Sequence, residues 1–363
     1  MRVLVVNAGS SSIKVSLVDA DDSELAIREL EAPAGHFDAT ALKSAIREME
    51  TIDAVGHRVV HGGARYSASV RVDPTVMAYL RKISDLAPLH MPAALDGILA
   101  VRKLMPRVPA VACFDTSFHS TMPPAAATYA IPERWRERFG IRRFGFHGFS
   151  HKYAARRASE LLARPLARLR IVTCHLGSGA SLAAVNRGRS VDTTMGFTPL
   201  EGLVMATRSG TVDPGMLLWL QRHEGFSERQ LTDALDGRSG LLGLAGTKDM
   251  REVLVRKAAG DERATLALDV YIHRLRAYIA SMAAAMNGLD ALVFTGGVGE
   301  NSAPVRGAAA AGLRFLGVDV DQKLNASVKT DADISAKDAA ARTLVVRARE
   351  DVEVARDVRR LLG

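Results

Sequence analysis

A strand, a turn of glycine and serine, and a returning strand occur twice in this sequence, about half a chain apart. The first copy runs from an apolar stretch at 3–6, through the turn Asn7-Ala8-Gly9-Ser10-Ser11-Ser12, into an alternating stretch at 13–18. The second runs from 170–174 through a turn at 175–181 into 182–185. Gly9 and Gly177 are 168 positions apart in a chain of 363 residues. This repeat predicts two domains on a similar plan, each presenting a hairpin suited to gripping phosphate.

Helical signals lie between the predicted strands. Asp73-Pro74 is typical of an N-cap followed by proline at the first helical position, in a helix reaching about residue 83. Residues 263–287 predict one long helix and 351–362 a terminal helix, while 291–295 predict a short buried strand before Gly296-Gly297-Val298-Gly299. The chain length also favours about two domains, at roughly 150 residues each. Alternating strands and helices predict an α/β fold.

Composition excludes several classes of protein. Hydrophobic residues make up 48% of the chain, enough to bury two cores, yet no apolar run approaches the ~20 residues of a membrane-spanning helix. We therefore expect a cytoplasmic protein with no membrane partner. Cys113 and Cys174 each lie in an apolar run, which predicts buried free thiols. The net charge of +8 comes from dispersed basic residues, so we expect no nucleic-acid partner.

Familiar catalytic motifs are absent or incomplete. The sequence contains no P-loop, no protein-kinase set and no complete G-x-G-x-x-G. Two histidine pairs have the i, i+4 spacing of zinc ligands on a helix, but they lie in glycine-containing stretches without the HExxH glutamate: His57 with His61, and His147 with His151. Ser11-x-x-Lys14 matches a signature of acyl-serine enzymes, but its S-D-N and K-T-G companions are missing. Zinc chemistry and serine hydrolysis are therefore disfavoured.

Four polar residues in predicted loops form a more promising set: Arg58, Asp115, His147 and Arg208. Each alone is typical of a structural role, such as an ion pair or a capped turn. Arginine, however, stays charged and binds carboxylate and phosphoryl oxygens in a two-pronged way. Together with two candidate phosphate turns, this set indicates chemistry on anions.

Motifs along nearly the whole chain resemble one family. They are NAGSSSIK at 7–14, GHRVVHGG at 56–63, LAPLHMP at 86–92, FDTSFH at 114–119, FGFHGFSH at 144–151, HLGSGAS at 175–181, MGFTPLEG at 195–202 and GGVGENS at 296–302. In this order they resemble the acetate kinase family. The resemblance implies the actin-like ATPase (acetate and sugar kinase) fold, with two related domains, a nucleotide cleft between them, and a homodimer. We expect a first domain of 1–117 plus 352–363 and a second of 118–351, which would hold the nucleotide site and the dimer interface.

The implied reaction is reversible, in-line phosphoryl transfer from ATP to acetate, giving ADP and acetyl phosphate. Acetate is already ionised at neutral pH, so the task is electrostatic: two anions must be brought together. Alternatives within the family are a kinase that prefers propionate or butyrate, or one that uses pyrophosphate. A non-catalytic nucleotide sensor is a further alternative, although a mere binder has no need of the acyl-site residues.

The resemblance also implies site residues. The catalytic residues would be Arg58, Asp115, His147 and Arg208. The acid, acetate first and propionate second, would contact Arg58, Val60, Leu89, His90, Phe146 and Pro199. The nucleotide and its phosphates would contact Ser10, Ser12, Lys14, His175, Gly177, Ser178, Gly179, Asp249, Arg251, Gly297, Gly299, Glu300 and Asn301. Asn7 and Glu350 would bind Mg²⁺, with Mn²⁺ as an alternative.

Three features depart from the family pattern. Ser178 stands where the family usually has asparagine in its second phosphate turn. Arg347-Ala348-Arg349 precedes Glu350 in place of a short threonine-asparagine stretch, and the segment 19–53 is shorter than in most relatives. The first two departures touch residues expected at the phosphate and metal sites. The third affects a peripheral part of the first domain.

Overall fold

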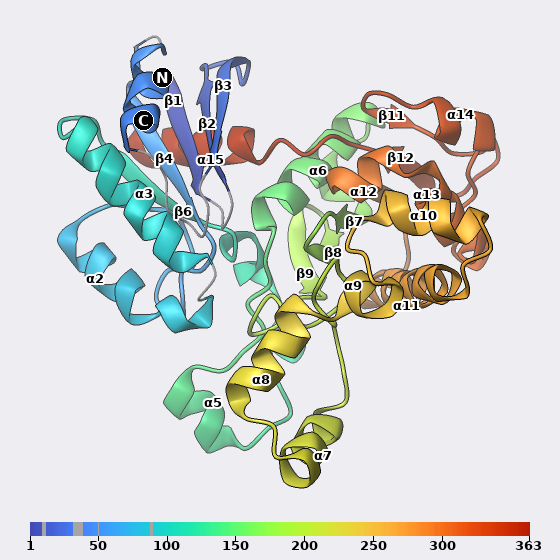
Figure 1. The fold of residues 1–363 in the computed structure, drawn as a ribbon. Coiled ribbons are helices and arrows are strands. Elements are labelled where there is room, and N and C mark those ends of the chain that lie inside the picture. Colours follow the sequence, from blue (N-terminus) through green and yellow to red (C-terminus); the bar gives the residue numbers. More distant parts are fainter. Residues whose placement is uncertain (9–11, 32–38, 50, 88–89) are drawn as a thin grey trace. The chain divides into compact units, whose positions relative to one another are not determined.

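The computed structural model describes residues 1–8, 12–31, 39–49, 51–87 and 90–363. The chain divides into two compact units, and each has its own mixed sheet flanked by helices (Figure 1). Unit 1 comprises Met1–Ser120, Phe146–Tyr153 and Arg349–Gly363, and unit 2 comprises Thr121–Gly145 and Ala154–Ala348. Helix α6 (Gly148–Leu161) begins in unit 1 and ends in unit 2.

The sheet of unit 1 has the strand order β3-β2-β1-β4-β6-β5. Its strands are β1 (Val3–Ala8), β2 (Ser12–Val18), β3 (Glu24–Glu31), β4 (Ala54–Val59), β5 (Val70–Arg71) and β6 (Ala110–Phe114). Its helices are α1 (Ala39–Arg47), α2 (Pro74–Lys82), α3 (Met91–Leu104) and α15 (Glu350–Leu362), with short 3₁₀ turns at Ser84–Leu86 and Ser117–Thr121. Strands β1, β4 and β6 are parallel, so their carboxyl ends meet at one edge.

Both faces of this sheet are covered, as β1 illustrates. Val3 and Val5 pack with buried side chains of α15, whereas Leu4 and Val6 pack with those of α1 and α3. Successive side chains of a strand point to opposite faces, so an unbroken apolar run is what a doubly covered strand requires. On β4, a Cβ at Gly56 would lie 2.7 and 2.8 Å from two valine side chains of α15. Glycine at this position therefore lets α15 pack closely on the sheet.

The sheet of unit 2 has the strand order β11-β12-β10-β7-β8-β9. Its strands are β7 (Arg170–Leu176), β8 (Ala180–Asn186), β9 (Arg189–Thr193), β10 (Ala291–Thr295), β11 (Ala332–Asp333) and β12 (Arg342–Val345). Its helices are α4 (Pro124–Ala127), α5 (Glu133–Phe139), α7 (Pro214–Glu224), α8 (Glu228–Thr232), α9 (Gly240–Ala245), α10 (Met250–Ala258), α11 (Glu262–Ala285), α12 (Gly296–Asn301), α13 (Ala303–Ala311) and α14 (Gln322–Ser327). Short turns lie at Leu166–Arg168, Asp233–Gly237 and Arg314–Leu316.

The two sheets share one topology. Written from β9, the second sheet reads β9-β8-β7-β10-β12-β11 and matches β3-β2-β1-β4-β6-β5 strand for strand. The senses match as well: three antiparallel strands, two parallel additions and an antiparallel edge strand in each. The α/β fold and the repeated plan predicted from the two hairpins are confirmed.

Most predicted elements lie where the sequence placed them. The strands of both hairpins, the strand at 291–295 and the long and terminal helices all form, with boundaries that differ by at most two residues. The predicted N-cap is also present, because the Asp73 carboxylate accepts a hydrogen bond from the Val76 amide at 2.7 Å. Cys113 and Cys174 are buried free thiols, as predicted.

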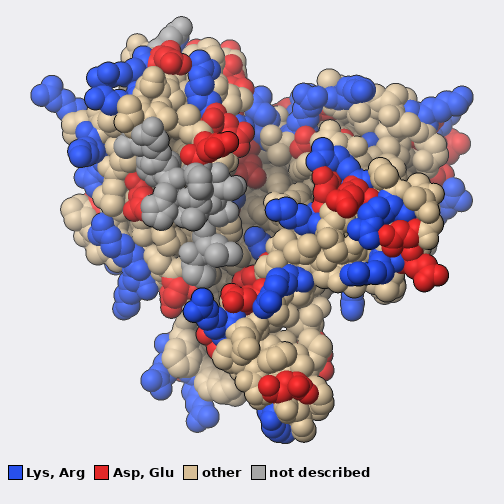
Figure 2. Space-filling model, viewed as in Figure 1, with Lys and Arg blue, Asp and Glu red and all other residues tan. Residues whose placement is uncertain are grey.

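The surface carries its charges in a dispersed way. Figure 2 shows Lys and Arg spread over the visible face and interspersed with Asp and Glu, rather than gathered into one broad basic patch. Among the residues that the structure describes, no helix has the length and apolar character needed to cross a membrane.

Candidate active site

Arg58 lies near the carboxyl end of β4, at the edge where the parallel strands of unit 1 end. Strand register places it opposite Asn7 of β1 and Cys113 of β6. Asp115 follows directly after β6 and Glu350 is the first residue of α15. Carboxyl ends of parallel strands are the usual place for ligand-binding side chains in such sheets. The fold of unit 1 therefore gathers residues from four distant parts of the sequence.

The Arg58 guanidinium is held on three sides. It forms a two-pronged pair with Asp115, in which Nε donates to Oδ1 at 2.9 Å and Nη2 donates to Oδ2. Nη1 donates to the Asn7 side-chain oxygen at 2.9 Å, and Glu350 Oε2 lies 3.3 Å from Nε. Asp115 is 1% exposed and Arg58 17%. This network fixes the orientation of a charged guanidinium before any ligand binds.

Burial and charge shift the pKa values of this network in a consistent way. Burial raises the pKa of Asp115 to about 6, against the opposing effect of Arg58. Burial disfavours the charged form of Arg58, but the carboxylates of Asp115 and Glu350 raise its pKa above the ordinary value. At pH 7 the network therefore contains an ionised Asp115 and a cationic Arg58.

His147 is positioned next to this network by its backbone. The Gly148 amide donates to the Asp115 carbonyl at 3.1 Å, and a Cβ at Gly148 would lie 2.0 Å from that oxygen. Only glycine permits this approach, and it brings the segment 146–148 against Asp115. His147 itself has φ +55°, an uncommon conformation outside glycine that the surrounding contacts must maintain.

The other candidate site residues of unit 1 differ in burial and in their contacts. Val60 and Phe146 are buried, and the Phe146 ring meets His61 edge-on at 5.5 Å between centroids. Lys14 lies directly across the β1–β2 ladder from Asn7, but the Ser12 hydroxyl donates to Glu29 of β3 at 2.8 Å. His90 precedes α3. Leu89, Ser10 and Ser11 lie outside the described residues.

In unit 2, the second glycine-serine turn connects β7 to β8. The Gly177 amide donates to the Gly179 carbonyl at 3.0 Å, which closes the turn after His175. The Ser178 carbonyl accepts a hydrogen bond from the Ala206 amide at 3.1 Å. This bond ties the turn to the loop that carries Arg208, so two sets of candidates predicted separately are joined in the structure.

Arg208 has a different environment from Arg58. Its Nη1 donates to the Pro199 carbonyl at 3.0 Å and lies 3.7 Å from the Met205 sulfur. Among the described residues no carboxylate forms a salt bridge with it. Burial lowers the pKa of Arg208, and the more distant Asp236 opposes this only in part. Arg208 is thus a largely buried cation whose partners are neutral.

Three polar residues that sequence reasoning missed position the Pro199 segment. Glu201 accepts hydrogen bonds from the Tyr129 hydroxyl and from Arg143 Nη2, the latter at 2.6 Å. The Tyr129 hydroxyl in turn accepts from the Phe197 amide at 2.9 Å. Glu201 belongs to the MGFTPLEG motif, but no local pattern indicates its partners, which lie 72 and 58 positions away.

Six candidate nucleotide residues of unit 2 lie at the start of α10 or within the short helix α12. Asp249 caps α10 and pairs with Arg251, whose Nη2 lies 2.6 Å from Asp249 Oδ2; this hydrogen bonding lowers the pKa of Asp249 to about 2. Gly297, Gly299, Glu300 and Asn301 lie in α12. Glu300 Oε1 accepts from the amides of Gly296 and Ala348, both at 2.9 Å. That oxygen therefore braces α12 against the strand end after β12.

Comparisons with known proteins identify the same family that the sequence motifs resemble. The family model described as the Acetokinase family matches residues 31–356. This chain belongs to the acetokinase family. It is 42% identical over 395 aligned positions to a protein named acetate kinase from Carboxydothermus hydrogenoformans, covering 100% of this chain and 99% of that protein.

Solved structures of acetokinase relatives share the fold. A crystal structure of Porphyromonas gingivalis acetate kinase matches with a TM-score of 0.90 and 38% identity, covering 100% of both chains. A crystal structure of a propionate kinase from Francisella tularensis matches with a TM-score of 0.89 and 36% identity, covering 98% of both chains. The chain thus has the two-domain fold of the acetate kinases, as the motifs predicted.

Proposed function

We propose that this acetokinase is an acetate kinase, which transfers the γ-phosphoryl group of ATP to the carboxylate of acetate and runs the reverse reaction from acetyl phosphate and ADP. The observation that carries the proposal is the fixed Arg58 network of unit 1. A guanidinium clamped by Asp115, with its orientation set before ligand binds, suits a reaction whose barrier is mainly electrostatic.

Phosphoryl transfer to acetate requires positively charged side chains rather than a general base. Acetate is ionised at neutral pH, so its attack on the γ-phosphorus needs no proton removal. Both reactants are anions, and Arg58 and Arg208 offer fixed positive charge for them. Arg208 forms no salt bridge among the described residues, so an anionic ligand would be its first direct ion-pair partner. His147 would donate a hydrogen bond to the transferring group, and Asp115 would position Arg58.

Asn7 and Glu350 fit a magnesium site by their chemistry. Both present hard oxygen atoms near the same guanidinium, and Mg²⁺ prefers a few such oxygens together with waters and phosphate oxygens. Among the described residues no group of three or more His, Cys, Asp or Glu could hold a metal alone. Bound there, Mg²⁺ or Mn²⁺ would neutralise charge on the nucleotide phosphates.

The other candidates divide between the nucleotide and the acid. Lys14, Ser12 and the turn at 177–179 would contact phosphates, while Asp249, Arg251 and α12 would contact the nucleoside. Val60, Phe146 and Pro199 would contact the methyl group of the acid. An extra methylene is worth about 1–3 kcal/mol in such a pocket, so we propose acetate as the preferred acid and propionate as a poorer one.

We also propose a homodimer. Helix α7 buries none of its own residues in this chain, and it exposes Met216, Leu218 and Trp219 by 41%, 62% and 53%. Helix α5 exposes Trp135 and Phe139 by 46% and 57%. Large apolar side chains exposed on neighbouring turns are typical of a surface that a second copy covers.

Because the reaction consumes ATP, we propose that the protein is located in the cytoplasm.

The test is trapping of the acyl phosphate. Acetate, ATP and Mg²⁺ are incubated with the protein and hydroxylamine, and acetohydroxamate is measured. We expect hydroxamate with acetate, less with propionate at equal concentration, and none without ATP. A sensor would bind ATP without forming hydroxamate, and a pyrophosphate-dependent kinase would form it only when pyrophosphate replaces ATP.

A further inference from the structure

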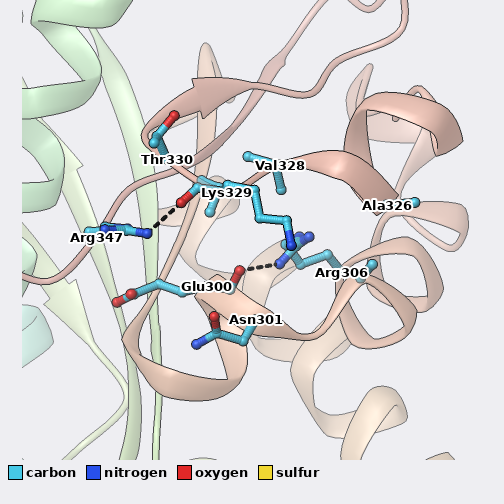
Figure 3. A pocket seen from close by; sticks show the side chains of 10 residues that line it. Glu300, Asn301, Arg306, Ala326, Val328, Lys329, Thr330 and Arg347 are labelled. Atoms are coloured by element: carbon cyan, nitrogen blue, oxygen red, sulfur yellow. Dashed lines mark hydrogen bonds between the residues drawn. The ribbon is translucent and has the colours of Figure 1, made fainter.

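Unit 2 contains a cavity beside α12, and among its lining residues Glu300 and Asn301 are the two assigned a role above. Its volume is about 210 Å³. It lies between α12, α13, the segment after α14 and the end of β12 (Figure 3). The lining residues that matter here are Glu300, Asn301, Arg306, Lys329, Thr330 and Arg347. Polar side chains thus dominate its wall.

Three of these side chains are cations, and in the described part of the chain none of the three forms a salt bridge. Arg306 is buried, whereas Lys329 and Arg347 are exposed at the rim of the cavity. Arg347 Nη2 donates only to the Lys329 carbonyl, at 2.5 Å. Figure 3 shows the Lys329 side chain extending from its loop towards Arg306. Two cations directed towards each other repel unless an anion joins them.

Arg306 is the buried member of this group. It is 2% exposed, and its partners are neutral: Nη1 donates to the carbonyls of Gly299 and Glu300 at 2.9 and 2.8 Å, while Nε and Nη2 donate to Asn325. Burial lowers the pKa of Arg306, and no carboxylate opposes that effect. A buried cation without a counter-charge is costly, so this position favours an anion in the adjoining space.

Among the described lining residues one carboxylate is present, that of Glu300, and it is already hydrogen-bonded to backbone amides. Glu300 Oε1 is engaged by the amides of Gly296 and Ala348. Its hydrogen bonds hold it at the α12 edge of the cavity, and it forms no salt bridge with any described cation. The cavity wall therefore carries three positive charges against one negative charge that is already committed to backbone amides.

We propose that this cavity binds a small phosphate-bearing anion, at a site separate from phosphoryl transfer. Its volume is below the ~300–1,000 Å³ typical of drug-sized ligands, which favours an anion of the size of inorganic phosphate over a nucleotide. Lys329 and Arg347 would contact the phosphate oxygens directly, and Thr330 offers a hydroxyl at the same rim. The phosphate could come from inorganic phosphate or from an acyl phosphate.

The site is tested by calorimetric titration of the full chain with inorganic phosphate, and in parallel with acetyl phosphate. Lys329→Ala and Arg347→Ala should each weaken binding at least tenfold. Lys323→Ala is the matched control, because Lys323 is an exposed lysine of the neighbouring α14 that does not line the cavity. Lys329→Gln gives a second variant, and thermal melting verifies that each protein is folded. Arg306 is left intact because its hydrogen bonds support α12.

Binding at the transfer site must be separated from binding in the cavity. Phosphate binding that depends on Lys329 should persist in Arg208→Ala and at saturating ADP, and the hydroxamate activity of Lys329→Ala should match that of the parent. Loss of phosphate binding in Arg208→Ala but not in Lys329→Ala would contradict the proposal. So would displacement of phosphate by ADP, or the absence of saturable binding of either phosphate compound. A preference between the two compounds identifies the source.

Discussion

The two units share one strand order but treat their key arginines in opposite ways. In unit 1, Arg58 is paired with Asp115 and held by Asn7 and Glu350, so its charge is compensated within the chain. In unit 2, Arg208 contacts a carbonyl and a sulfur, and burial lowers its pKa. One scaffold thus supports an ion-paired guanidinium in one copy and, among the described residues, a guanidinium without a salt bridge in the other.

This difference indicates a division of labour. A compensated arginine holds its orientation whether or not substrate is present, which suits positioning. An uncompensated, largely buried arginine gains most from an incoming anion, which suits stabilising charge on a transferring group. Substitution of Arg58 should therefore lower both activity and stability, whereas substitution of Arg208 should mainly lower activity.

The largest expected effect is on turnover in Arg208→Ala. Removing a fixed cation that stabilises the transferring group should lower kcat by at least ~10²-fold, as for loss of one transition-state donor. Arg189→Ala, which removes an exposed arginine of β9 in the same unit, should retain the parent kcat. Steady-state kinetics with ATP and acetate provide the measurement. Near-normal kcat in folded Arg208→Ala would reject its role.

The two arginines should also differ in how much they contribute to stability. Arg58→Ala leaves the Asp115 carboxylate buried without its partner, and breaking a buried pair in this way costs about 3 kcal/mol. Arg208→Ala breaks no ion pair, so its unfolding free energy should fall by less. Urea denaturation of both variants measures this. Equal losses would show that the two arginines are not as differently embedded as their contacts indicate.

Glu350→Gln should change the response to magnesium. The variant keeps the side-chain volume but removes one negative charge, so we expect a several-fold higher Mg²⁺ concentration for half-maximal activity. Glu262→Gln, at an exposed position at the start of α11, is the matched control. The measurement is a magnesium titration at fixed ATP. An unchanged titration in Glu350→Gln would place the metal on other residues.

The smallest expected effect is a change in the pH dependence of stability, and it arises from a residue of unit 1. Burial lowers the pKa of His57 to about 3, whereas the unfolded chain titrates near ~6.5. Between these values the unfolded state binds more protons, so stability is lost as the pH falls below ~6.5, by up to about 1.4 kcal/mol per pH unit. His57→Leu should reduce this slope, and His273→Leu, at an exposed position of α11, should not. Thermal melting between pH 7 and 5 measures it, and an unchanged slope in His57→Leu would contradict the assignment.

Local pattern was enough to predict the scaffold. The apolar run of β1, the alternation in β2 and the glycine-serine turn indicate the first hairpin from neighbouring residues alone, and the same pattern recurs at 177. Likewise Asp73-Pro74 defines the start of α2 by capping chemistry alone. These features depend on neighbours within a few positions, and such neighbours are visible in a sequence.

The partners within the site were not predictable in this way. Arg58 meets Asp115 and Glu350 only because β4, β6 and α15 converge, and their spacing of 57 and 292 positions carries no local signal. The family motifs named these residues, but not the geometry that joins them. Nor could sequence show that Ser12 donates to Glu29 or that Glu300 braces α12. The residue roles proposed above therefore stay predictions until variants are measured.

The most direct measurement of the central claim is ³¹P NMR of the complete reaction. ATP, acetate, Mg²⁺ and the protein should give acetyl phosphate and ADP in equal amounts, and omission of acetate should leave ATP intact. Formation of AMP and pyrophosphate would instead indicate attack at the α-phosphorus. Formation of ADP and inorganic phosphate without acyl phosphate, or no consumption of ATP by the folded protein, would equally contradict phosphoryl transfer to the carboxylate.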